Sequence, residues 1–100
     1  MKIVTAFVRT TSLENIVKSL QGIGVKSMTI EEIKGIGQEV SLNKPYAIHD
    51  RIDIILPDEK ADRVVNIILE HGRTGLAGDG LIVVQPADYA VKIRTKEKLT

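Results

Sequence analysis

The stretch KIVTAFVRTTSLENIVKSL, residues 2–20, changes its apolar period from that of a strand to that of a helix. Residues 2–9 are rich in β-branched side chains and predict a strand. Thr11 and Glu14 follow at the spacing of a helix capping box. The apolar residues around them recur at helical spacing: Leu13, Ile16, Val17 and Leu20. We therefore expect a strand and then a helix, which ends near Gly22.

The same kinds of element return along the rest of the chain. Residues 27–34 predict a second strand, residues 51–56 a third, and residues 81–84 a fourth. A second helix is expected to begin at Pro57 and to stop at Gly72. Its apolar positions also have helical spacing: Ala61, Val64, Val65 and Ile68. The order βαββαβ predicts a ferredoxin-like α+β sandwich with an antiparallel sheet.

The length and composition bound the class of protein. Residues 1–100 provide one domain, with a polar loop at 35–50 and a C-terminal tail at 86–100. The net charge is +1, so we expect no nucleic-acid partner. The absence of cysteine excludes disulfides and thiolate metal sites. Met1 leads into a strand without a signal-peptide pattern, and no apolar run could cross a bilayer, so we expect a cytoplasmic protein.

The first strand is apolar on both of its faces. Ile3 and Phe7 alternate with Val4, Ala6 and Val8, so neither face is polar. The two helices should cover one face of the sheet, which leaves the other apolar face without a cover. We expect another copy of the chain to cover it.

The histidines of the chain are not arranged as in catalytic or metal-binding sites of other proteins. His49 and His71 have no partner at a metal-ligand or catalytic-triad spacing. His71 stands at the end of the second helix, where a cation complements the helix dipole. We therefore predict no catalytic residues and no metal site, and a protein that is not an enzyme.

The stretch RTGLAGDGLIVV, residues 73–84, has three glycines in six positions, and two explanations stay open. Asp79-Gly80 is a preferred tight-turn pair. Alternatively, the glycines let the backbone approach a phosphate. Cations stand beside this stretch, beside the Gly35–Gly37 loop and in the tail: Arg73, Lys34, Lys92 and Arg94.

Several stretches together resemble the PII signal-transduction family: TGLAGDGLIVV, KGIG at 34–37, VKIRT at 91–95, LENIVKSLQGIGVKSMTI and RIDIILPDE. The resemblance implies a homotrimer of ferredoxin-like subunits that binds an adenine nucleotide (ATP, ADP or AMP) in the clefts between subunits. It also implies signalling through the 35–50 loop to a partner, either a membrane transporter or a metabolic enzyme. The alternative is a trimeric interaction module, or a sensor of a small ligand such as bicarbonate or a cyclic dinucleotide, that has lost ATP binding.

By position, the resemblance implies this nucleotide-binding set: Gly35, Gly37, Gln38, Asp53, Arg73, Thr74, Gly75, Gly78, Asp79, Gly80, Lys92 and Arg94. The residues from Thr74 to Gly80 would form the phosphate loop, and Asp53 would lie near the adenine. Lys92 and Arg94 would reach the phosphates from a neighbouring subunit. Valine at Gly78 or Gly80 should then abolish nucleotide binding and leave the trimer intact.

The chain departs from the family pattern at charged positions. Leu81 stands where the family has a lysine, and Lys92 stands where it has an arginine. Gln38 and Glu39 replace an arginine and a glutamine, and the glutamine helps to hold magnesium and 2-oxoglutarate in the family. His49 replaces a lysine that pairs with that oxo-acid. The resemblance therefore leaves open whether magnesium and 2-oxoglutarate bind. With fewer cations for the phosphates, ADP or AMP is at least as suitable a ligand as ATP.

Overall fold

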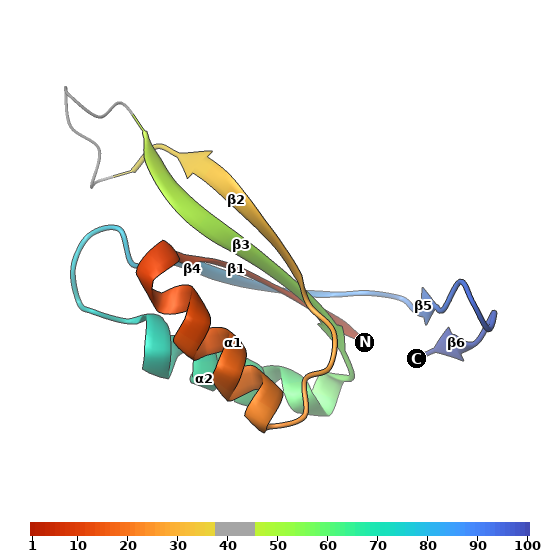
Figure 1. Ribbon diagram of the computed structural model, residues 1–100. Helices are drawn as coiled ribbons and strands as arrows, with labels where there is room; N and C mark the ends of the chain where they lie inside the picture. Colours follow the sequence, from red (N-terminus) through yellow and green to blue (C-terminus); the bar gives the residue numbers. More distant parts are fainter. Residues whose placement is uncertain (38–45) are drawn as a thin grey trace.

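The computed structural model describes residues 1–37 and 46–100. Its elements in chain order are β1 (Lys2–Arg9), the 3-10 turn η1 (Thr10–Ser12), α1 (Leu13–Gly22), β2 (Thr29–Gly35), β3 (Ala47–Leu56), α2 (Asp58–Gly72), β4 (Gly80–Pro86), β5 (Ala90–Val91) and β6 (Lys98–Leu99). The first four strands form an antiparallel sheet in the order β2-β3-β1-β4. Both helices lie on one side of this sheet (Figure 1). The predicted ferredoxin-like α+β fold is confirmed.

The core lies between the sheet and the two helices. It consists of aliphatic side chains from β1, α1, β3 and α2: Val4, Ala6, Val8, Ile16, Leu20, Ile52, Ile54, Leu56, Ala61, Val64 and Ile68. Full burial of one such large side chain contributes roughly 1.5–3 kcal/mol, so these contacts hold the two layers together. The predicted helical stripes are confirmed for the residues that enter the core, whereas three predicted members are only partly buried: Leu13, Val17 and Val65.

Several predicted strand boundaries are wrong by a few residues. β3 begins at Ala47 instead of residue 51, because His49 and Asp50 pair with β1 on one side and with β2 on the other. The ladders on both sides outweigh the polar character of these residues. β2 reaches Gly35, so the ends of the loop predicted at 35–50 belong to strands. β2 begins at Thr29 instead of residue 27, and β4 extends from Gly80 to Pro86.

The predicted capping box before α1 is also wrong. Thr11 lies inside the 3-10 turn η1, which continues directly from β1. The helix N-cap is therefore Ser12, whose side chain makes no capping hydrogen bond. Since the cap lies one residue later than predicted, Glu14 no longer stands three residues after it.

The sheet face opposite the helices carries both apolar and charged side chains. Ile3 pairs with Ile55 and Phe7 pairs with Leu81, so these four share this open face. Ile55 is 56% exposed and Leu81 is 62% exposed in the single chain. The apolar open face predicted from the alternation in the first strand is therefore present. Among the described residues, no helix has the length and apolar character needed to span a membrane.

Candidate functional site

Asp79 organises the glycine loop, residues 73–80, between α2 and β4. Its carboxylate accepts hydrogen bonds from the amides of Thr74 (2.7 Å) and Gly75 (2.8 Å). It also accepts one from the Thr74 hydroxyl. The Thr74 hydroxyl, the Arg9 guanidinium and the two amides outweigh desolvation and hold the pKa of Asp79 far below its usual range. Asp79 is therefore ionised and turned toward its own loop.

Arg9, at the end of β1, fixes the same loop from the neighbouring strand. Its Nε donates to Asp79 Oδ1 at 3.0 Å, and its Nη2 donates to the Ala77 carbonyl oxygen at 2.6 Å. Sequence reasoning did not assign Arg9 to the site. The signal that points to it is topological, because the antiparallel pairing of β1 with β4 brings the end of β1 to the start of β4. Arg9 neutralises Asp79 and sets the path of the loop.

The glycines of the loop serve different purposes. Gly75, Gly78 and Gly80 have φ of +87°, +94° and +107°, which L side chains rarely adopt. A Cβ on Gly80 would lie 2.8 Å from the carbonyl carbon of Phe7 and would overlap its oxygen. A Cβ on Gly75 would meet no atom within 4 Å. The expectation that valine at Gly80 would spare the fold is therefore wrong, because the approach of β4 to β1 itself requires that glycine.

The glycine loop faces the end of β2 across a cavity of about 480 Å³. Gly35 and Gly37 line it on one side, and Gly78 and Gly80 line it on the other. His49 Nε2 lies 2.9 Å from the Gly78 carbonyl oxygen and ties β3 to the loop. The structure thus brings four of the predicted glycines together. Gln38 lies outside the described residues.

Asp53 does not line this cavity but lies farther along β3, on the open face of the sheet. Its carboxylate accepts a hydrogen bond from the Thr5 hydroxyl at 2.6 Å and one from Arg51 Nε at 2.9 Å. Burial opposes its ionisation, but the Thr5 hydroxyl and the Arg51 guanidinium outweigh burial and hold the pKa of Asp53 below its usual value. The two partners fix the orientation of this carboxylate.

Lys92 and Arg94 lie in the tail, at the other end of the sheet from the glycine loop (Figure 1). The tail folds back on itself, because β5 pairs with β6 and the Lys92 amide donates to the Glu97 carbonyl at 2.9 Å. β4 joins the loop to the tail and spans seven residues. At ~3.3 Å per residue, these cover about 20 Å. The structure therefore does not bring Lys92 or Arg94 to the glycine loop of the same chain.

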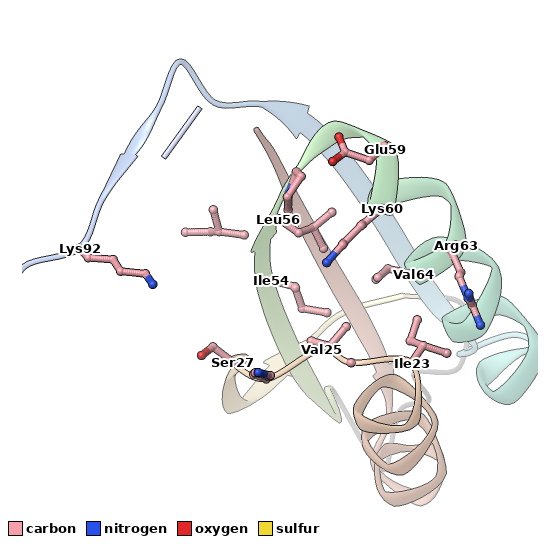
Figure 2. A pocket seen from close by; sticks show the side chains of 14 residues that line it. Ile23, Val25, Ser27, Ile54, Leu56, Glu59, Lys60, Arg63, Val64 and Lys92 are labelled. Carbon is pink, nitrogen blue, oxygen red and sulfur yellow. The ribbon is translucent and has the colours of Figure 1, made fainter. Parts of the chain in front are cut away.

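A second cavity, of about 630 Å³, adjoins the tail. Its apolar walls come from the α1–β2 connection, the end of β3 and α2: Ile23, Val25, Ile54, Ile55, Leu56 and Val64. Four cations and one carboxylate also line it: Lys26, Lys60, Arg63, Lys92 and Glu59. Figure 2 shows Lys60 from α2 and Lys92 from the tail directed into this space from different sides. The cavity can hold a flat apolar group next to an anion.

The chain matches known proteins along almost its entire length. The family model described as Nitrogen regulatory protein P-II matches residues 1–97. Nitrogen regulatory protein P-II 2 of Methanothermobacter thermautotrophicus is 33% identical, over 97% of this chain and 92% of that protein. Nitrogen regulatory protein P-II of Rhizobium etli is 36% identical, over 97% of this chain and 95% of that protein. The protein of the same name from Haemophilus influenzae is 31% identical, over 98% of this chain and 96% of that protein.

The chain belongs to the P-II family. The resemblance inferred from the sequence motifs is confirmed, and it extends beyond them to residues 1–97. The family is described as nitrogen regulatory, so membership indicates a regulatory protein.

The histidines of this P-II chain have structural contacts. His71 Nε2 lies 2.9 Å from the Ser19 hydroxyl oxygen, which joins α2 to α1. His71 also lies in the last turn of α2, as predicted for a residue that complements the helix dipole. Within the described parts of the chain, no three His, Cys, Asp or Glu side chains are grouped in a way that could hold a metal ion.

Proposed function

We propose that this P-II protein is a regulator that binds an adenine nucleotide between the subunits of a homotrimer. It acts without catalysis, and it controls a transporter or a metabolic enzyme through the loop that follows Gly37. One observation supports the proposal: the glycine loop and the tail cations, to which the resemblance assigns phosphate binding, lie at opposite ends of the sheet within one chain (Figure 1). Since about 20 Å of β4 separates them, a complete site needs two chains.

The first half is the glycine loop. Arg9 and Asp79 hold its shape, and the backbone amides of Ala77 and Gly78 donate to no acceptor among the described residues. Backbone amides at positive φ form concave sites that suit phosphate oxygens. This half supports binding of an anion but offers little surface for a base.

The second half is the tail cavity. Ile54 and Ile55 give it apolar walls, which suit a purine base, and Lys92 supplies a cation for the adjoining phosphate. Arg94 follows two residues later in the same exposed turn. When the tail cavity of one subunit meets the glycine loop of the next, base and phosphate each have a suitable surface.

The apolar open face supports assembly. Ile3, Phe7, Ile55 and Leu81 lie there, and a monomeric protein rarely leaves such a face to water. Three sheets that face one another around an axis would cover these side chains. The Arg51–Asp53 pair, bound to Thr5, would enter the interface already neutralised.

Complementation between two defective chains tests this function. The first variant, Ala77→Asp, adds a negative charge to the exposed glycine loop, and Ala77→Asn is its uncharged control. The second variant combines Lys92→Ala with Arg94→Ala in the tail. Each variant alone should form trimers in sedimentation and bind no AMP, ADP or ATP in calorimetric titration.

Trimers co-expressed from the two variants at equal amounts should regain about a quarter of the sites. By random assortment, this is the share of interfaces that join an intact loop to an intact tail in a ring. Recovery of no sites, with wild type binding normally, would refute a site between subunits. Wild-type trimers that bind none of the three nucleotides would favour the small-ligand alternative.

A further inference from the structure

Asp50 places a buried carboxylate near the start of β3. It is 8% exposed, and its neighbours in the sheet are Val8 of β1 and Glu32 of β2. Directly paired residues of an antiparallel sheet point to the same face, and Val8 belongs to the core. The Asp50 side chain therefore lies on the helix side of the sheet, opposite the open face that carries Asp53.

No cation of the described chain neutralises Asp50. Within residues 1–37 and 46–100 the ion pairs join other groups, and Asp50 makes no hydrogen bond. Lys34 shares this face of β2, but its ammonium lies 4.7 Å from the centre of the Tyr46 ring. A carboxylate taken out of water without a partner is strongly unfavourable. Since no fully buried polar atom of the described ranges lacks a partner, the carboxylate still touches solvent, and an ion can reach it.

Glu32 adds a second negative charge beside the first. In such a ladder, the Cβ atoms of directly opposed residues lie about 4.5–5.5 Å apart. Glu32 is exposed, and in the part of the chain that the structure describes it has no ion pair and no hydrogen bond. Like charges directly opposite each other destabilise a sheet. A positive ion between the two carboxylates would remove both the repulsion and the unpaired buried charge.

The turn η1 brings a hydroxyl to the same end of β3. It follows β1 directly, and it contacts β3 where Arg9 pairs with His49. Ser12, its last residue, is 8% exposed, and its hydroxyl has no hydrogen bond among the described residues. Carboxylate and hydroxyl oxygens are the donors that hard divalent cations take. Mg²⁺ in particular binds through one or two carboxylates and keeps several waters, so it does not require a third acidic residue.

We propose that Asp50, Glu32 and the Ser12 hydroxyl form a binding site for a hard divalent cation such as Mg²⁺. The two carboxylates balance the two charges of the ion, and the bound ion would tie β2, β3 and η1 together. The cavity beside the glycine loop includes Ile33 and His49, which pair on the opposite face of the sheet. The cation site is therefore separate from the proposed nucleotide site.

Calorimetric titration of the full-length protein with MgCl₂, CaCl₂ or MnCl₂, without nucleotide, tests the proposal. Wild type should bind one ion per subunit with a Kd of ~0.1–1 mM, the weak end of the range for carboxylate sites. Asp50→Asn and Glu32→Gln should each weaken binding by at least ~10-fold, the effect of one charged contact. Glu31→Gln is the matched control, because Glu31 is the next residue of β2 but pairs with Arg51 on the open face. It should bind the ion as wild type does.

Urea denaturation at one fixed protein concentration gives an independent readout. A cation at ten times its Kd should raise the folding equilibrium constant of wild type by ~10-fold per subunit and leave that of Asp50→Asn unchanged. With EDTA, Asp50→Asn should be at least as stable as wild type, because it removes an unpaired buried charge. Absence of binding by all three cations up to ~10 mM, or equal binding by Asp50→Asn, would overturn the site. Since no nucleotide is present, neither result bears on the proposed function.

Discussion

Replacement of Gly80 by alanine should destabilise the fold itself. Its φ of +107° lies in a region where a side chain costs of order 1–3 kcal/mol. The new Cβ would also lie 2.8 Å from the carbonyl carbon of Phe7 and overlap the oxygen, so β4 must move away from β1. One or two ladder hydrogen bonds beside Val8 would be lost, at about 1 kcal/mol each. The free energy of unfolding should therefore fall by about 2–5 kcal/mol.

Gly75→Ala is the matched control for this prediction. Gly75 has a similar φ of +87°, but a Cβ there would meet no atom within 4 Å. The fall in its free energy of unfolding should be limited to the cost of the backbone conformation, of order 1–3 kcal/mol as at Gly80, without the loss from displacing β4. Urea denaturation at one fixed protein concentration compares the two, since assembly makes the midpoint depend on concentration. The reasoning is refuted if the two variants unfold within about 0.5 kcal/mol of each other, because they differ in the contact with Phe7.

Three further changes test the contacts around the loop and between the helices. Asp79→Asn should make the free energy of unfolding depend less on pH in the acid range. The pKa of Asp79 is lowered in the folded protein, so its carboxylate stabilises the fold above about pH 4 and progressively less below that pH. Denaturation of the variant and of wild type at a series of acid pH values measures this difference. Arg9→Ala should weaken AMP binding by ~10-fold, and Arg9→Lys should weaken it less, because lysine can keep one of the contacts with Asp79 and the Ala77 carbonyl. Equal calorimetric affinities in wild type and both variants would contradict a role of Arg9 in positioning the loop. Ser19→Ala removes the contact with His71, so the free energy of unfolding should fall by about 0.5–1.5 kcal/mol in urea denaturation while AMP affinity stays unchanged.

Periodicity predicted most of the fold, because it reports directly which side chains are buried. The strand at residues 2–9 and the helical stripe of α2 were correct for this reason. The start of β3 was not predicted, since His49 and Asp50 are polar and their strand conformation comes from pairing on both sides. Such pairing joins residues that are distant in sequence, so a local pattern does not contain it.

The candidate site could likewise be predicted only in part from the sequence. The glycines and the tail cations stand out in the sequence, but the Arg9–Asp79 contact joins residues that are 70 positions apart. Only the order of the strands brings these two side chains together. The motif also gave no indication that Asp79 turns its carboxylate toward its own loop.

The structure distinguishes the glycines of RTGLAGDGLIVV by how much the fold itself requires each of them. Gly80 is required by the close approach of β4 to Phe7, which is a purely structural reason. Gly75 has open space around it, so the structure of the single chain needs only its backbone conformation. A substitution at Gly80 that abolishes ligand binding would therefore say nothing about a ligand, because the loop would no longer be held in place. Changes that leave the backbone intact, such as Ala77→Asp against Ala77→Asn, separate the phosphate explanation from the turn.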